Sequence, residues 1–264
     1  MSDLNPPWTY VLVHGGGSTA RFWDRLVPLL DRPVGAAVLA VDLPGRGAHP
    51  ADLGSITVDD EVASVLGDID ATCPDGPVVL VAHSSGGLVV PGVVSGLGGR
   101  VERIVLVAAL VPPEGGNGLD CMQPRHAEGL RAFHDALGPD DPPITLPGPP
   151  DDPEPFRTAT GGEALDDDTL RFVVDPVRLV PDTVEHYFQP VRWSQVVDAP
   201  GDVEVTYVAT LRDRPIPVDL QREMAGRLPL AAQVVELVTG HLAPITHPGL
   251  VADAVVQGRP SSTS

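Results

Sequence analysis

VVLVAHSSGG, residues 78–87, reads as a strand, a sharp turn and the beginning of a helix. The apolar run Val78–Ala82 is typical of a buried strand, and the small residues after it allow that strand and the next helix to approach closely. A serine at such a turn has a strained backbone conformation that points its hydroxyl off the carboxyl edge of a sheet. We therefore predict that Ser84 is a nucleophile, beside the free N–H groups and positive dipole end of the following helix.

The turn departs from the usual Gly-x-Ser-x-Gly pattern at its first position, which is Ala82. Alanine has the next smallest side chain, so the turn is expected to form with little added crowding. Ser85 is the alternative nucleophile, but its register places His83 at the first position, where the ring would crowd the turn. The pattern therefore favours Ser84.

Apolar runs like this one recur along the chain, and they are continuous rather than alternating with polar residues. Continuous runs are typical of strands buried on both faces, as in a parallel sheet covered by helices. The sequence therefore predicts an α/β fold with a mostly parallel, doubly wound sheet of about six strands. The six runs are Trp8–His14, Ala36–Asp42, Pro77–His83, Val101–Ala109, Val203–Thr210 and Gln233–Thr239.

Amphipathic segments between the runs predict the covering helices. Thr57, with Asp60 three residues later, fits a variant of the capping box and predicts a helix start. Pro91 predicts a kink or an early end in the helix after Ser84. The other predicted helical segments are Ala20–Leu30, Ser85–Leu97, Val218–Leu228 and Pro248–Val256.

The strand–helix alternation stops between about residues 112 and 195. Pro139–Pro155 holds eight prolines and five acidic residues, which predicts a loop. Helical stretches are expected near Ala164–Val173 and Pro181–Phe188. Aromatic residues on both sides of the loop favour a packed insertion over a disordered linker. We therefore predict a cap over residues 112–194, inserted into a core made of residues 1–111 and 195–264, with His186 facing the substrate pocket.

A serine alone is a weak nucleophile, so it needs donors for the developing oxyanion. The first apolar run ends in His14, and three glycines follow it. Glycines directly after a strand let backbone N–H groups face a small anion. We assign the oxyanion hole to the N–H groups of Gly16 and Ser85. Gly17 is the close alternative donor and a predicted pocket residue, and His14 is predicted to hold loops by hydrogen bonds.

The base and its orienting acid are expected after the last two strands, at the edge that carries the serine. His241 follows the last run on a glycine turn, with His247 as its nearby rival. Asp213 follows the preceding run, whereas Asp202 precedes that run and Asp219 lies in the next helix. The order serine, aspartate, histidine along the chain is the one that an elbow-type serine enzyme uses. The carboxylate holds the imidazole tautomer and stabilises the imidazolium.

The bulk composition narrows the function classes. The 264 residues carry a net charge of −19, which argues against binding nucleic acid or an anionic membrane. All 17 basic residues are arginine, so lysine chemistry is excluded. The two cysteines form no disulfide framework or metal cluster, and no metal or cofactor is expected. The acidic clusters Asp140–Asp141, Asp151–Asp152 and Asp166–Asp168 are predicted to be solvated loops.

The chain shows no pattern of a signal peptide and no run of 18 apolar residues. We expect a cytoplasmic protein that acts on a small molecule. The oligomeric state is left open by the sequence.

These residues resemble the α/β-hydrolase superfamily, and most closely its plant methylesterase and hydroxynitrile lyase branch with the bacterial relatives of that branch. The resemblance implies the α/β-hydrolase fold with an inserted cap. The matching stretches cover most of the core and little of the cap. They are Val11–Gly15, Phe22–Trp23, Leu26–Leu30, Val41–Gly47, the turn at Ser84, Thr210–Gln221 and Val235–Pro248.

Two positions depart from the lyase members. The resemblance implies a threonine after the first histidine and a lysine after the base, where this chain has Gly15 and Leu242. Because the lysine charge serves a leaving cyanide, cyanohydrin cleavage is not expected. We predict hydrolysis of a small, largely apolar ester, thioester, lactone or amide through an acyl-enzyme. The alternatives are a biosynthetic cyclase, lyase or acyltransferase on the same residues, and a ligand-binding receptor on this scaffold.

Overall fold

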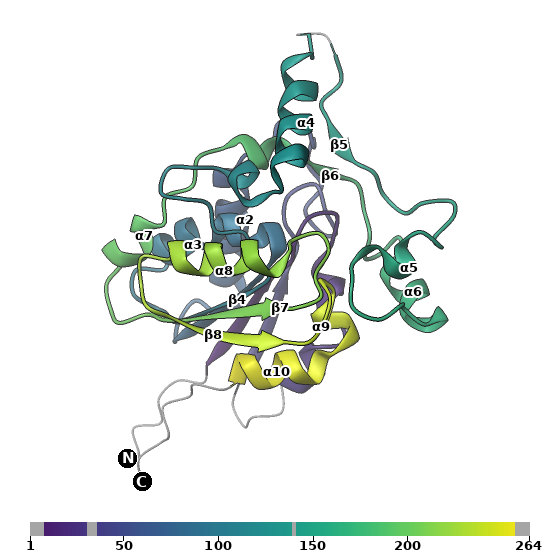
Figure 1. The fold of residues 1–264 in the computed structure, drawn as a ribbon. Helices are drawn as coiled ribbons and strands as arrows, with labels where there is room; N and C mark the ends of the chain where they lie inside the picture. Colours follow the sequence, from purple (N-terminus) through teal and green to yellow (C-terminus); the bar gives the residue numbers. More distant parts are fainter. Residues whose placement is uncertain (1–7, 31–35, 139–140, 257–264) are drawn as a thin grey trace, which may run out of the picture.

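A six-stranded, fully parallel sheet forms the centre of the computed structural model, which describes residues 8–30, 36–138 and 141–256 (Figure 1). The order across the sheet is β2-β1-β3-β4-β7-β8. The strands are β1 (Thr9–Val13), β2 (Ala37–Val41), β3 (Val78–His83), β4 (Val101–Val107), β7 (Glu204–Thr210) and β8 (Ala232–Leu237). Each predicted run therefore forms a strand, and the predicted α/β class is confirmed.

The strand order reverses direction at β1, because the chain passes from β1 to β2 on one side and then to β3 on the other. Val13 at the end of β1 is paired with Ala82 near the end of β3. The loop after β1 and the turn after β3 therefore emerge side by side. In open α/β sheets this reversal at the carboxyl edge is where ligands bind.

Helices cover both faces of the sheet, as the continuous apolar runs predicted (Figure 1). Alternate residues of one strand point to opposite faces, so Val11 and Val13 of β1 lie in one apolar cluster while Tyr10 and Leu12 lie in the other. The inner strands are buried except at Glu102 in β4 and Glu204 in β7. The edge strand β8 is different: Val234 is 46% exposed, because no strand lies beyond it.

Two predicted helices are each divided into two elements. Ala20–Leu30 forms the 3₁₀ turn η1 (Ala20–Trp23) and the short helix α1 (Val27–Leu30). Pro28 explains the break, since proline has no N–H for a continuous helix and fits only a first turn. After β3 the chain forms η2 (Ser84–Val89) and then α3 (Val90–Gly96), with Pro91 in the first turn of α3. The remaining core helices are α2 (Val58–Thr72), α8 (Val218–Arg227), α9 (Ala243–Thr246) and α10 (Pro248–Val256).

The predicted capping box at the start of α2 is confirmed. The Thr57 hydroxyl accepts the Asp60 N–H at 3.0 Å, and the Asp60 carboxylate accepts the Thr57 N–H at 2.9 Å. Replacing Thr57 by alanine should lower the free energy of unfolding by about 1 kcal/mol, because two helix-end groups lose a partner. Urea unfolding followed by circular dichroism measures this. Thr72→Ala, at the exposed carboxyl end of α2, is the control; an equal loss there would contradict the capping explanation.

The insertion between β4 and β7 is more structured than predicted. Its longest helix, α4 (Pro124–Asp135), was not expected, and it projects with β5 beyond the carboxyl edge of the sheet (Figure 1). The Pro139–Pro155 stretch is a loop where described, except for β5 (Thr145–Leu146). The helix predicted at Pro181–Phe188 is wrong, because β6 (Asp182–Thr183) pairs with β5 and only a 3₁₀ turn, η4 (Glu185–Phe188), follows.

The insertion also contains η3 (Gly118–Cys121), α5 (Phe156–Ala159) and α6 (Asp167–Val173), and α7 (Ser194–Asp198) crosses the predicted boundary at residue 194. Helix α7 packs against α3 of the core. Helix α6 corresponds to the helical stretch predicted near Ala164–Val173.

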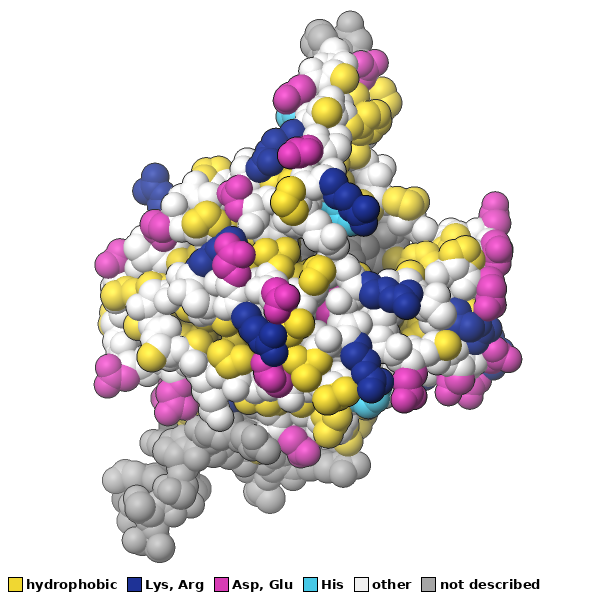
Figure 2. Space-filling model, viewed as in Figure 1, with side chains coloured by type: hydrophobic (Ala, Val, Ile, Leu, Met, Phe, Trp, Pro, Cys, Tyr) yellow, Lys and Arg dark blue, Asp and Glu magenta, His cyan; other side chains and the backbone are white. Residues whose placement is uncertain are grey.

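Acidic side chains gather around α5 and α6 on the face shown in Figure 2. Asp151, Asp152 and Asp166–Asp168 are exposed, as predicted, but Asp166 caps α6 rather than lying in a loop. Asp140 lies outside the described residues.

In the described part of the chain, no helix combines the length and apolarity needed to span a membrane.

Candidate active site

The turn after β3 has the strained geometry that its sequence predicted. Ser84 has a backbone φ of 52°, in the left-handed region that residues with a side chain rarely adopt. A Cβ on Gly86 would lie 2.6 Å from the carbonyl oxygen of His14, and one on Gly15 would lie 2.7 Å from the Ser84 Cβ. Both glycines therefore allow the turn to press against the end of β1. A side chain at Gly15 would collide with the turn.

The structure brings Ser84, His241 and Asp213 together in one chain of hydrogen bonds. The Ser84 Oγ lies 3.1 Å from the His241 Nε2, and the His241 Nδ1 lies 2.6 Å from the Asp213 Oδ2. The serine follows β3, the aspartate follows β7 and the histidine follows β8. All three loops leave the same edge of the sheet, which is how residues so distant in sequence meet.

The Asp213 carboxylate is held on both oxygens. Its Oδ1 accepts the Ile216 N–H at 2.8 Å, and its Oδ2 accepts the Thr210 hydroxyl at 2.8 Å as well as the histidine. Gln221 supports this loop by accepting the Thr210 N–H at 3.0 Å and donating to the Ile216 carbonyl at 2.7 Å. Sequence reasoning missed Thr210 and Gln221, because each looks like an ordinary polar residue until the loop closes.

The rival residues lie elsewhere. Asp219 is exposed in the first turn of α8, where it forms an ion pair with Arg222. Asp202 is exposed and precedes β7. The His247 Nδ1 lies 2.9 Å from the hydroxyl of Thr246.

The glycine loop after β1 lies against the turn that carries Ser84. A Cβ on Gly16 would lie 3.0 Å from the Tyr187 hydroxyl and 3.5 Å from the Ser85 Oγ. Within the described residues the Gly16 N–H has no hydrogen-bond acceptor. The Gly17 N–H, in contrast, donates to the Asp182 Oδ2 at 2.7 Å. Of the two glycines that the sequence left as alternative oxyanion donors, Gly16 therefore has a free N–H within the described residues, whereas the N–H of Gly17 is already bonded.

Two buried histidines brace these loops. The His14 ring lies 2.8 Å from the Gly15 carbonyl oxygen through Nδ1 and accepts the Leu43 N–H at 3.2 Å, as expected for a loop-holding role. Burial and Arg46 lower its pKa to about 4. Sequence reasoning missed His83, whose Nε2 lies 2.9 Å from the His241 carbonyl oxygen. Burial, followed by the nearby His241, lowers the pKa of His83 well below its ordinary value, so this neutral ring donates to the loop of the base.

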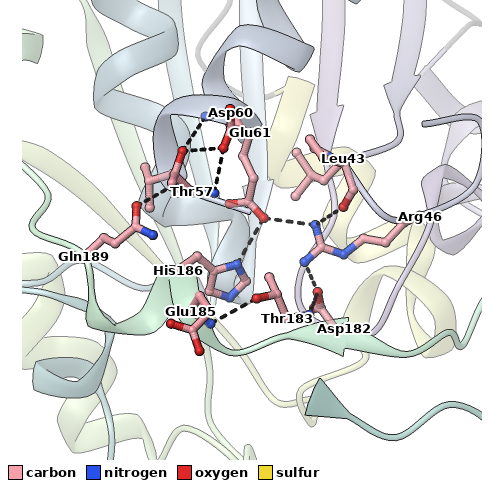
Figure 3. A network of polar contacts seen from close by, with 12 residues as sticks. Leu43, Arg46, Thr57, Asp60, Glu61, Asp182, Thr183, Glu185, His186 and Gln189 are labelled. Carbon is pink, nitrogen blue, oxygen red and sulfur yellow. Dashed lines mark hydrogen bonds and ion pairs between the residues drawn. The ribbon is translucent and has the colours of Figure 1, made fainter. Parts of the chain in front are cut away.

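A buried charge network joins the core to the insertion (Figure 3). Arg46 donates to the Glu61 Oε1 at 2.9 Å and forms an ion pair with Asp182. The His186 Nδ1 lies 3.0 Å from the same Glu61 oxygen. Burial alone would raise the pKa of Glu61, but His186 and Arg46 outweigh it and lower that pKa to about 2. The His186 ring is 1% exposed and faces Glu61. Its predicted contact with substrate stays a prediction.

The insertion also touches the loops that carry Asp213 and His241. The His241 N–H donates to the Thr160 carbonyl at 3.0 Å, and Gly161 forms an isolated bridge with Asp213. A Cβ on Gly240 would lie 2.2 Å from the Gly161 carbonyl oxygen, so the insertion packs tightly on the loop that carries His241.

Within the described residues, no three or more His, Cys, Asp or Glu side chains group in a way that could hold a metal ion.

A serine at a strained strand–helix turn, with histidine and aspartate loops at the same edge of a doubly wound sheet, is the arrangement of the hydrolase class built on this fold. The family model "Alpha/beta hydrolase family" matches residues 10–254. The chain therefore belongs to the α/β-hydrolase family, and its similarity to plant esterases and methylesterases supports the predicted branch.

Curated relatives match this chain in part. The chain is 36% identical over 107 residues to a probable esterase of rice, Oryza sativa, and the match covers 40% of each chain. It is 35% identical over 104 residues to polyneuridine aldehyde esterase of Rauvolfia serpentina, which covers 39% of each. A putative chloroplastic methylesterase of Arabidopsis thaliana is 27% identical over 228 residues, covering 83% of this chain and 56% of the relative. These matches thus span about two fifths to just over half of the relatives' lengths.

Solved structures show the same fold over nearly the whole chain. An extracellular α/β-hydrolase of a Paenibacillus species has a TM-score of 0.76, 23% identity, and coverage of 95% of this chain and 98% of its own. Polyneuridine aldehyde esterase has a TM-score of 0.70, 19% identity, and coverage of 94% and 98%. At these identities the likeness concerns the fold.

Proposed function

We propose that this protein is a serine hydrolase that cleaves a small, largely apolar carboxylic ester, or a related thioester, lactone or amide. The observation that carries the proposal is the Ser84–His241–Asp213 chain, at 3.1 and 2.6 Å. A hydroxyl within hydrogen-bond reach of an oriented imidazole is the arrangement that activates a nucleophile. The esterase names of the relatives support the choice of ester hydrolysis.

The proposed reaction has two halves. The Ser84 Oγ attacks the carbonyl carbon while the His241 Nε2 takes its proton, and the oxyanion binds the N–H groups of Gly16 and Ser85. The protonated His241 then gives that proton to the leaving alcohol as the bond to the carbonyl carbon breaks. A water, deprotonated by His241, attacks the acyl-enzyme, and the acid product leaves as Ser84 regains its proton. Asp213 stabilises the imidazolium in both halves.

Residues 112–194 are proposed to act as the cap over this site. Their contacts with Asp213 and with the backbone of His241, through Gly161 and Thr160, support a covered reaction centre. The residue after the base is the apolar Leu242, which supplies no charge for a leaving anion and supports acyl hydrolysis over cyanohydrin cleavage.

A fluorophosphonate probe tests this chemistry directly, because it phosphonylates only an activated serine. We expect one adduct by intact mass, mapped to the peptide containing Ser84, and hydrolysis of p-nitrophenyl esters with a preference for short acyl chains. Intact mass after rapid acid quench should also show the acyl-enzyme. A protein that takes up no label and releases every ester unchanged would contradict the proposal.

A further inference from the structure

The three glycines after β1 offer two N–H groups that could stabilise an oxyanion, and a residue of the insertion distinguishes them. The Gly17 N–H donates to the Asp182 Oδ2 at 2.7 Å, and the Gly17 carbonyl accepts the Val180 N–H at 2.9 Å. Ser18 and Leu179 form an antiparallel bridge next to these bonds. The insertion therefore hydrogen-bonds both the N–H and the carbonyl of Gly17, while in the described part of the chain it leaves the N–H of Gly16 without a partner.

Asp182 is fully buried and all of its partners donate. Its Oδ1 accepts the Thr183 N–H at 2.7 Å and pairs with Arg46 (Figure 3). A buried carboxylate without such partners would be strongly destabilised. Arg46 is itself held by Glu61 at 2.9 Å, from helix α2 of the core. The carboxylate thus has a fixed position relative to the core, although its residue belongs to the insertion.

We propose that Asp182 is a positioning residue of the oxyanion hole, an inference that rests on the proposed function. Its carboxylate engages the Gly17 N–H, sets the turn of the glycine loop and leaves the Gly16 N–H as the loop's donor to the oxyanion. Gly17 has a φ of 66°, which a glycine adopts at little cost. A Cβ on Gly16 would lie 3.3 Å from the Asp182 Oδ2 and 3.5 Å from the Ser85 Oγ, so a shift of Asp182 is expected to move the loop relative to the second donor, the Ser85 N–H.

Asp182→Asn is the sharpest variant because its amide has one preferred orientation. Oδ1 faces two donors, one of them charged, whereas Oδ2 faces only the Gly17 N–H. The asparagine oxygen should take the Oδ1 position, so its NH₂ points at the Gly17 N–H. Two donors then oppose each other, and the glycine loop moves while the Arg46 contact survives.

We expect Asp182→Asn to lower kcat for p-nitrophenyl acetate by about 10- to 100-fold, somewhat less than the loss of a whole oxyanion donor. KM should change by less than about threefold. The affinity for phenylboronic acid, which forms a tetrahedral adduct on an active serine, should fall in parallel with kcat. Asp120→Asn is the matched comparison, since that carboxylate also lies in the insertion, accepts a backbone N–H (from Asn117 at 2.9 Å) and pairs with an arginine, Arg131, but contacts neither Gly17 nor Arg46. It should lower kcat by less than about threefold.

A measurement on the unaltered protein avoids any folding defect of the variants. In ¹⁵N-glycine-labelled protein, the Gly17 amide should be protected from hydrogen exchange and unmoved by phenylboronic acid. The Gly16 amide should shift when the boronic acid binds. A boronic acid shift at Gly17 in place of Gly16, or a folded Asp182→Asn variant with unchanged kcat, overturns the inference. An unaltered protein that neither reacts with fluorophosphonate nor hydrolyses esters overturns the proposed function instead.

Discussion

Replacing Ser84 with alanine should lower kcat for the best p-nitrophenyl ester by about 10⁵- to 10⁶-fold, the loss typical of removing the nucleophile of such a triad. The physical reason is that alanine has no hydroxyl to attack the substrate carbonyl, so His241 has no proton to take and no acyl-enzyme can form. The fold should persist, because Ser84 is only partly buried and alanine keeps the Cβ that the strained backbone already accommodates. Steady-state kinetics at high enzyme concentration, with Tm from circular dichroism, measure both effects.

Ser95→Ala is the matched control, because it makes the same chemical change at an exposed position of α3. It should keep kcat within about twofold and should still take up the fluorophosphonate label. Full turnover by the Ser84 variant on the protein's true substrate would mean that the reaction does not pass through this hydroxyl.

Replacing Asp213 with asparagine should lower kcat by about 10⁴-fold while leaving the fold intact. The Asp213 Oδ1 accepts the Ile216 N–H at 2.8 Å, and a backbone N–H can only donate, whereas the Thr210 hydroxyl and the imidazole at Oδ2 can each also accept. The asparagine oxygen should therefore stay at the Oδ1 position, and its NH₂ should face His241. The imidazole then has to accept at Nδ1 and carry its proton on Nε2. In that tautomer it cannot take the proton of Ser84, which is why an isosteric change has so large an effect.

Asp219→Asn provides the comparison, since Asp219 is exposed on α8 and lies only six residues further along the chain. It should leave kcat within about twofold. Kinetics should be paired with ¹⁵N-histidine NMR, where the Asp213 variant is expected to show the Nε2-protonated tautomer of His241. An unchanged tautomer together with a large loss of kcat would point to a displaced loop instead.

Local sequence was sufficient for the sheet and for the three residues that meet at its edge. Each run was identifiable because a strand covered on both faces needs continuous apolar residues, and the serine turn needs small neighbours within a few positions. Asp213 and His241 followed from the same rule, because the carboxyl ends of parallel strands share one edge. The exposed edge strand β8 and the predicted helix Ala20–Leu30, which is divided between Trp23 and Val27, show where this local rule weakens.

The insertion was poorly predicted, since its short elements are set by contacts with distant segments. Asp182 lies in a two-residue strand whose partner, β5, is in a proline-rich loop. Nothing near it in the sequence indicates that it would meet Arg46 and Gly17, which are 136 and 165 residues away. His83 is similar, since its role depends on the loop after β8.

Patterns of a few residues thus determined which side chains meet at the edge of the sheet, because apolar runs and small residues impose their geometry locally. Tertiary structure decided which N–H groups of the glycine loop are bonded and which buried charges, such as those of Asp182 and Glu61, are neutralised. A buried carboxylate is stable only where several donors converge on it, and that convergence exists only after the insertion has packed on the core.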